Sequence, residues 1–127
     1  MVRILVVDDD ELVRLSIGTV LARAGHRVVL ACDGEDALRR YRAARFDLVI
    51  TDIVMPRMEG LETVRALRGA GREVKILAIS GGARPGSGLY LTAARALGAD
   101  GALFKPFTPA ELNSAIARIL HEPVAAW

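Results

Sequence analysis

Five short apolar runs alternate with stretches of helical periodicity, and this alternation limits the possible folds more than any other feature of the sequence. The runs are rich in β-branched residues, which is typical of strands buried on both faces of a parallel sheet. They are Ile4–Val7, Val28–Ala31, Leu48–Ile50, Ile76–Ile79 and Ala102–Phe104. Because crossovers between parallel strands are right-handed, this order predicts a doubly wound α/β fold with helices on both faces of the sheet.

The predicted helices have clear start and stop signals. Gly25 and Gly98 are expected to close the first and fourth helices, and Gly69 with Gly71 the third, since glycine is the preferred residue just past a helix end. Thr108 and Glu111 form a capping box at the start of the fifth helix. The chain therefore contains five strand–helix units in succession.

A chain of 127 residues fits one compact domain. We expect this domain to span residues 1–120, followed by a C-terminal tail over residues 121–127 and no output domain. All apolar stretches are short, so neither a transmembrane span nor a signal peptide is expected. The net charge of +2 is too small to indicate a nucleic-acid partner.

Cys32 is the single cysteine, which excludes an internal disulfide and favours a reducing compartment, the cytoplasm. Because Cys32 follows an apolar run, we expect its thiol to be buried and inert. With one cysteine and two distant histidines, the chain has no zinc-ligand spacing.

Polar side chains follow four of the five apolar runs. They are Asp8, Asp9 and Asp10 after the first run, Asp52 after the third, Ser80 after the fourth and Lys105 after the fifth. The carboxyl ends of parallel strands share one edge of the sheet, where ligands of open α/β sheets bind. The sequence therefore predicts one pocket that holds carboxylates, a hydroxyl and an ammonium group.

This set of groups is suited to phosphoryl transfer. Crowded carboxylates repel one another unless a cation joins them, and oxygen ligands without His or Cys favour Mg²⁺. Ser80 and Lys105 can contact phosphoryl oxygens, and a carboxylate can itself be the nucleophile. Singly, each residue is more often a helix cap, a turn residue or a solvated side chain, as we expect for Asp10. The coincidence of four positions favours a functional site.

Four segments resemble the receiver domains of response regulators in two-component signalling. They are ILVVDDD (4–10), DLVITDIVMPRMEG (47–60), ILAIS (76–80) and GADGALFKPF (98–107). The resemblance implies a flavodoxin-like five-stranded sheet with strand order 2-1-3-4-5. It also implies a stand-alone receiver, monomeric or weakly dimeric, that takes a phosphoryl group from a histidine kinase or histidine phosphotransfer protein. Such a receiver catalyses its own phosphorylation without turnover and signals by contact with a downstream protein.

The resemblance also implies a role for each site residue. Asp52 is the expected phosphoacceptor. The expected Mg²⁺ ligands are Asp9, Asp52 and the backbone carbonyl of Val54, and Asp8 is expected to assist through water.

The remaining roles concern the phosphoryl group and the loop after the phosphoacceptor. Lys105 is expected to pair with the phosphoryl group and Ser80 to donate a hydrogen bond to it. Gly81 is expected to leave room for the phosphate. Pro56 and Gly60 are expected to shape the loop.

The sequence departs from the family pattern at three positions. Ala102 stands where the family usually has Tyr or Phe, so the aromatic switch is missing there. Val54 and Gly82 offer no polar group to an attacking water, so we expect no side-chain acceleration of phosphoryl loss.

The bond between Lys105 and Pro106 is expected to be cis, which proline makes accessible.

Two other classes of function compete with the receiver. Asp8 and Asp10 form the Asp-x-Asp pattern of haloacid-dehalogenase-like phosphatases, in which Asp8 would be the nucleophile. A non-signalling interaction module that keeps the fold is the second alternative. Neither a Walker A loop nor a dinucleotide fingerprint follows any predicted strand.

Overall fold

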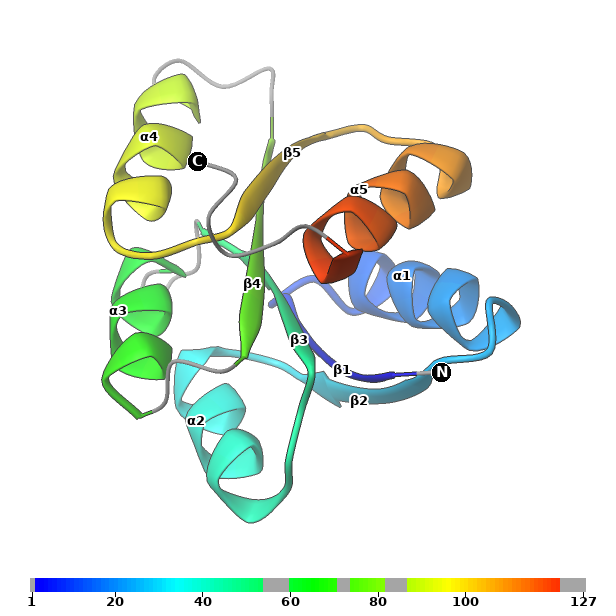
Figure 1. Ribbon diagram of the computed structural model, residues 1–127, viewed down its shortest axis with the longest axis horizontal. Helices are drawn as coiled ribbons and strands as arrows, with labels where there is room; N and C mark the ends of the chain where they lie inside the picture. Colours follow the sequence, from blue (N-terminus) through cyan, green and yellow to red (C-terminus); the bar gives the residue numbers. More distant parts are fainter. Residues whose placement is uncertain (1, 54–59, 71–73, 82–86, 122–127) are drawn as a thin grey trace.

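Five parallel strands form one sheet in the order β2-β1-β3-β4-β5, which confirms the expected flavodoxin-like topology (Figure 1). The computed structural model describes residues 2–53, 60–70, 74–81 and 87–121. The strands are β1 (Arg3–Val7), β2 (Arg27–Ala31), β3 (Leu48–Asp52), β4 (Lys75–Gly81) and β5 (Gly101–Lys105). The helices are α1 (Glu11–Arg23), α2 (Gly34–Ala43), α3 (Gly60–Ala70), α4 (Ser87–Ala96) and α5 (Pro109–His121).

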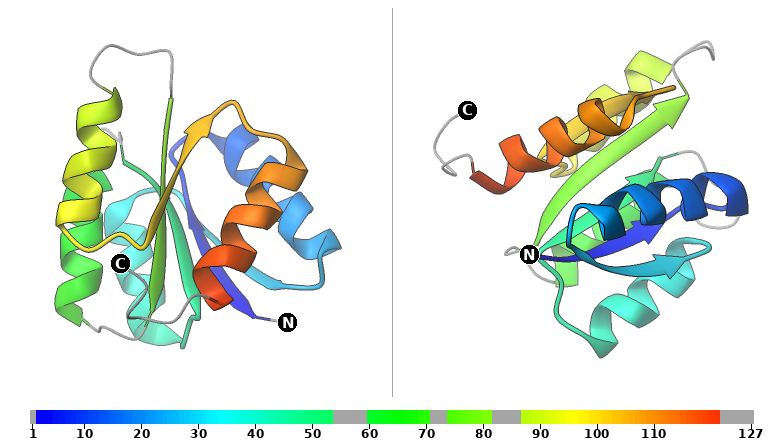
Figure 2. Two further views of the ribbon diagram at one scale, coloured as in Figure 1. Left: turned by 45° about the horizontal axis from the view of Figure 1, so that its top comes forward. Right: turned by 90° about the vertical axis from the view of Figure 1, so that its right-hand side faces the viewer.

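Helices cover both faces of the sheet, with α1 and α5 on one face and α2, α3 and α4 on the other (Figures 1 and 2). Each face has its own apolar cluster. Ile4 and Val6 pack with residues of α1 and α5, whereas Leu5 and Val7 pack with residues of α2, α3 and α4. Successive residues of a strand point to opposite faces, and helices cover both faces, so all four side chains are buried. This double burial explains why the strands are continuous apolar runs.

The caps predicted for α1, α4 and α5 are present. Asp10 caps α1 by accepting hydrogen bonds from the amides of Leu12 and Val13. Thr108 and Glu111 exchange both hydrogen bonds of the capping box. Gly98, just past α4, has a positive φ of 118°.

Helix α3 runs through Gly69 to Ala70, so Gly69 lies inside it, and Gly71, the other expected stop, lies outside the described residues. One expectation about local structure is wrong. Cys32 is exposed; it follows the last residue of β2, which is an edge strand of the sheet.

None of the helices in the described ranges combines the length and apolar character that crossing a bilayer requires. An open hollow of about 1180 Å³ lies at the amino ends of the strands, with Val2, Phe46 and Lys75 in its wall. It contains none of the polar residues that were predicted to form the pocket.

Candidate functional site

The strand register brings the predicted polar residues together at the carboxyl edge of the sheet. Asp8 directly follows β1, Asp52 ends β3, and Lys105 ends β5. Asp52 is the register partner of Ile79, and Gly81 is the partner of Lys105. The expectation of a single edge site is therefore met, because parallel pairing aligns the ends of neighbouring strands.

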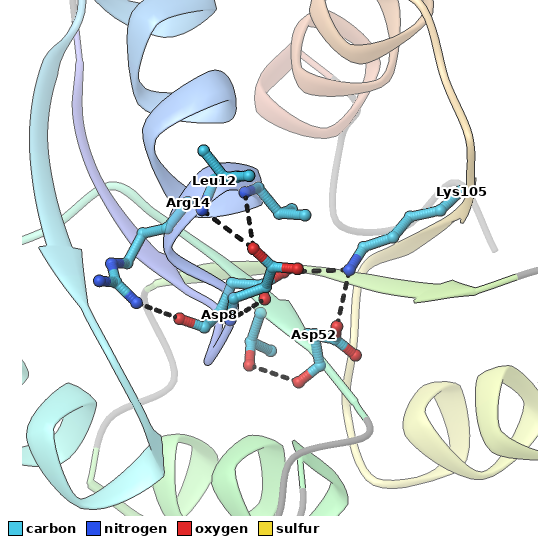
Figure 3. A network of polar contacts seen from close by, with 8 residues as sticks. Asp8, Leu12, Arg14, Asp52 and Lys105 are labelled. Atoms are coloured by element: carbon cyan, nitrogen blue, oxygen red, sulfur yellow. Dashed lines mark hydrogen bonds and ion pairs between the residues drawn. The ribbon is translucent and has the colours of Figure 1, made fainter.

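Lys105 forms the centre of the site (Figure 3). Its Nζ lies 2.8 Å from Asp52 Oδ2 and 3.1 Å from Asp8 Oδ2. The Asp8 side chain is fully buried, and that of Asp52 is 10% exposed. The ammonium group thus joins two carboxylates that come from different strands and would otherwise repel each other at close range.

Asp8, Asp9 and Asp52 offer carboxylate oxygens that all lie within 4.8 Å of one another. Three oxygen donors at this spacing, with no nitrogen or sulfur donor among them, fit a hard divalent cation such as Mg²⁺. Asp9 is the exposed member of the group, so it offers a carboxylate on the solvent side. The cluster therefore has the composition that the predicted metal site requires.

Burial and neighbouring charges shift the pKa values of Asp8 and Lys105 in opposite directions. Burial raises the pKa of Asp8, although a hydrogen bond from the Asp10 amide and the charge of Lys105 act to lower it. For Lys105, burial favours the neutral amine, but the hydrogen bond and charge of Asp52, reinforced by Asp8, raise its pKa above the ordinary value. The lysine therefore stays charged at neutral pH and stabilises the carboxylates around it.

Asp8 is held at four separate atoms. Its amide donates to Ala31 O across the sheet, and its Oδ1 accepts from the Asp10 amide at 2.9 Å. Its Oδ2 accepts from Lys105, and its main-chain carbonyl accepts from Arg14 Nη1 at 2.8 Å. Sequence reasoning missed Arg14, since nothing in the sequence distinguishes it from the other arginines of the chain.

Gly60, the first residue of α3, lies directly against the main chain of the expected phosphoacceptor. A Cβ atom placed there would lie 2.2 Å from Asp52 O and 2.0 Å from Ile53 Cα. The Gly60 amide also donates to Ile53 O at 3.1 Å. Helix α3 can begin this close to β3 only because residue 60 has no side chain.

Ser80 is buried in β4, and its register partner on β5 is Phe104, which is 48% exposed. Ala102 is exposed and pairs with Ala78, so the usual family aromatic is absent at this point of the sheet. Among the described residues, no atom lies within 4 Å of a Cβ placed on Gly81, which leaves open space beside it.

The peptide bond between Lys105 and Pro106 is cis, as expected from the sequence. The predictions for Val54, Pro56 and Gly82 lie outside the described residues.

The family model described as the response regulator receiver domain matches residues 4–117 of the chain. The chain belongs to this family. Response regulator MprA of Mycobacterium tuberculosis is 42% identical over 119 residues, which cover 94% of this chain and 50% of that protein. The chain thus spans about half the length of the curated relatives it matches.

Solved receiver structures agree with this assignment. The chemotaxis response regulator CheY4 of Vibrio cholerae is 36% identical, with a TM-score of 0.84 over 94% of this chain and 99% of that one. A response regulator receiver domain protein from Clostridium thermocellum is 27% identical, with a TM-score of 0.86 and 94% of each chain covered. The chain is therefore a receiver domain of two-component signalling.

Proposed function

We propose that this receiver accepts a phosphoryl group on Asp52 in a Mg²⁺-dependent reaction and signals by protein contact. One observation carries the proposal. The Lys105 ammonium group lies 2.8 Å from Asp52 Oδ2, within a cluster that also contains Asp8 and Asp9. A carboxylate with a fixed ammonium group beside it and two further acids for a cation has the groups that phosphoryl transfer needs.

The proposed donor is a phosphohistidine on a histidine kinase or on a histidine phosphotransfer protein. A carboxylate oxygen of Asp52 attacks phosphorus, and the phosphorus–nitrogen bond breaks as the new phosphorus–oxygen bond forms. The electron pair of the broken bond stays on the imidazole nitrogen, which then takes up a proton. The receiver catalyses this step on itself and is not a turnover enzyme.

Lys105, Ser80 and Gly81 are the proposed phosphoryl contacts. Lys105 neutralises charge on the transferred group, Ser80 donates a hydrogen bond to it, and the open space beside Gly81 admits it. Asp9 and Asp52 would hold Mg²⁺ directly with the backbone carbonyl of Val54, while Asp8 would contact it through water. When bound, the cation supplies further neutralisation of the phosphoryl oxygens.

The phosphatase alternative, in which Asp8 is the nucleophile, is disfavoured by the surroundings of Asp8. Its side chain is fully buried, and both of its carboxylate oxygens accept hydrogen bonds, from the Asp10 amide and from Lys105. A nucleophile must reach the phosphorus atom of its donor. Asp52, whose side chain keeps 10% exposure against none for Asp8, is better placed for this than Asp8.

Several finer features belong to the same proposal. We place the receiver unit at residues 1–120 and in the cytoplasm, as a monomer or weak dimer that contacts a downstream protein. A non-signalling interaction module would not need the pairing of Lys105 with Asp52.

Intact-mass measurement after incubation with acetyl phosphate and Mg²⁺ tests the proposal. Wild-type protein should gain the mass of one phosphoryl group, and Asp52→Asn should gain none. Asp8→Asn should still be labelled, although more slowly, because it keeps the Asp52 nucleophile. Labelling of Asp52→Asn together with loss of labelling in Asp8→Asn would favour the phosphatase alternative. No labelling of the wild type, even by a phosphorylated kinase, would favour the non-signalling module.

A further inference from the structure

We infer that Arg14 is a positioning residue of the acidic cluster: it holds the peptide that joins Asp8 to Asp9, so that the Asp9 carboxylate stays beside Asp52. This inference rests on the proposed function, because it concerns the residues that would bind Mg²⁺. Arg14 is not one of the groups that we propose to contact the phosphoryl group or the cation. It acts through the main-chain carbonyl of Asp8, to which its Nη1 donates at 2.8 Å.

The position of Arg14 on the fold makes this contact specific. Arg14 lies in the first turns of α1, six residues after Asp8, and its side chain reaches back to the end of β1. Lys105 approaches the carboxylate of Asp8 from the opposite side (Figure 3). Lys105 therefore fixes the side chain of Asp8, and Arg14 fixes its main chain.

The fixed carbonyl matters most for Asp9. The carbonyl of Asp8 and the amide of Asp9 belong to one planar peptide group, so a bond to the carbonyl sets the orientation of the whole group. Asp9 is exposed, whereas Asp8 is buried, and its carboxylate must still lie within 4.8 Å of those of Asp8 and Asp52. The anchored peptide therefore limits the directions in which the Asp9 side chain can leave the backbone.

A positioning role and simple electrostatics predict opposite changes in Mg²⁺ affinity when Arg14 is replaced. Arg14→Met removes a positive charge near the cluster, and by charge alone this change would tighten cation binding. If the hydrogen bond orients the ligands, the same change must weaken binding. Partners that orient metal ligands commonly contribute a factor of about ten or more to metal affinity.

Calorimetric titration with MgCl₂ shows whether replacing Arg14 weakens or tightens Mg²⁺ binding. We expect Arg14→Met to raise the dissociation constant for Mg²⁺ about tenfold, and Arg14→Lys, which keeps a donor and the charge, to give an intermediate value. Arg23→Met is the matched control, since Arg23 is exposed in the last turn of the same helix. It should bind Mg²⁺ as the wild type does. Equal or tighter binding by Arg14→Met would overturn the inference.

A second measurement, made without metal, separates this inference from the proposed function. The carbonyl carbon resonance of Asp8 should move upfield in Arg14→Met, and the Asp10 amide, which donates to Asp8 Oδ1, should exchange faster. Unchanged values for both would reject the positioning role even in a protein that binds Mg²⁺. A wild type that binds no Mg²⁺ would contradict the proposed function, while the Asp8 resonance would still show whether Arg14 holds the peptide.

Discussion

The ammonium group of Lys105 lies 2.8 Å from the carboxylate of Asp52, although 53 positions separate the two residues in the chain. The pair spans the sheet from β3 to β5 across β4. It forms because each residue ends its own strand at the same edge. The proposed phosphoryl chemistry relies on this pair, and we expect the local stability of the edge to depend on it as well.

Replacing Lys105 with Met should destabilise the protein most when no divalent cation is present. The change leaves the buried carboxylates of Asp8 and Asp52 without their common donor, which should cost about 1–3 kcal/mol in the free energy of unfolding. Mg²⁺ should restore part of the loss, because a bound cation also neutralises these groups. Urea unfolding in EDTA and in MgCl₂ measures both effects.

Lys75→Met is the control for this comparison, since Lys75 is the only other lysine and begins β4 at the opposite edge. Equal stability of the two variants in EDTA would show that the pairing of Lys105 with the carboxylates contributes nothing.

Gly60→Ala should distort the main chain at Asp52 and Ile53. Its Cβ would lie about 2 Å from the main chain of Asp52 and Ile53, so either α3 or the end of β3 must move. We expect a loss of about 3 kcal/mol or more in stability, together with slower phosphoryl capture from acetyl phosphate. In the same helix, a Cβ on Gly69 meets no atom of the described residues within 4 Å, so Gly69→Ala should stabilise the protein by about 0.5–1 kcal/mol. Similar unfolding curves for the two variants would contradict the predicted clash.

Arg68 joins three segments at the amino edge of the sheet. From α3 it donates to Gly98 O, to Val74 O and to the carboxylate of Asp100. Arg68→Met should cost about 2–3 kcal/mol in unfolding free energy, because these partly buried acceptors lose their donor. Arg65→Met, an exposed change in the same helix, should cost little. Chemical denaturation decides, and matching midpoints for the two variants would count against this role.

Ionisation of Asp36 should make the free energy of unfolding depend on pH in the acid range. Burial alone would raise its pKa, but the Cys32 amide and the side chains of Arg39 and Arg40 hold the pKa below 3.8. The ionised form is therefore favoured in the folded state. Its contribution is present above pH 3.8 and is lost as the pH falls through the folded pKa.

Asp36→Asn should accordingly be less stable than the wild type by about 1 kcal/mol at pH 7. The difference should shrink as the pH falls below 3.8. Urea midpoints measured across this range, with the exposed neighbour change Glu35→Gln as the control, test the sign. A difference that grows in acid would contradict it.

Residue order alone was enough to predict the five strand–helix units, the caps at Asp10 and Thr108, and the meeting of Asp8, Asp52 and Lys105. These features follow from local periodicity and from one rule of geometry. A polar residue directly after a parallel strand must lie at the carboxyl edge of the sheet. Asp8, Asp52 and Lys105 were therefore predictable as neighbours without any distance.

The residues that support these three side chains became visible only in the folded structure. Arg14 reaches the Asp8 carbonyl, and Gly60 lies against the Asp52 main chain, because α1 and α3 pack at particular heights on the sheet. The exposure of Cys32 likewise could not be predicted, because it depends on β2 being an edge strand of the folded sheet. Such contacts join residues whose separation and orientation are set by packing, and packing leaves no periodic signal in the order of the residues.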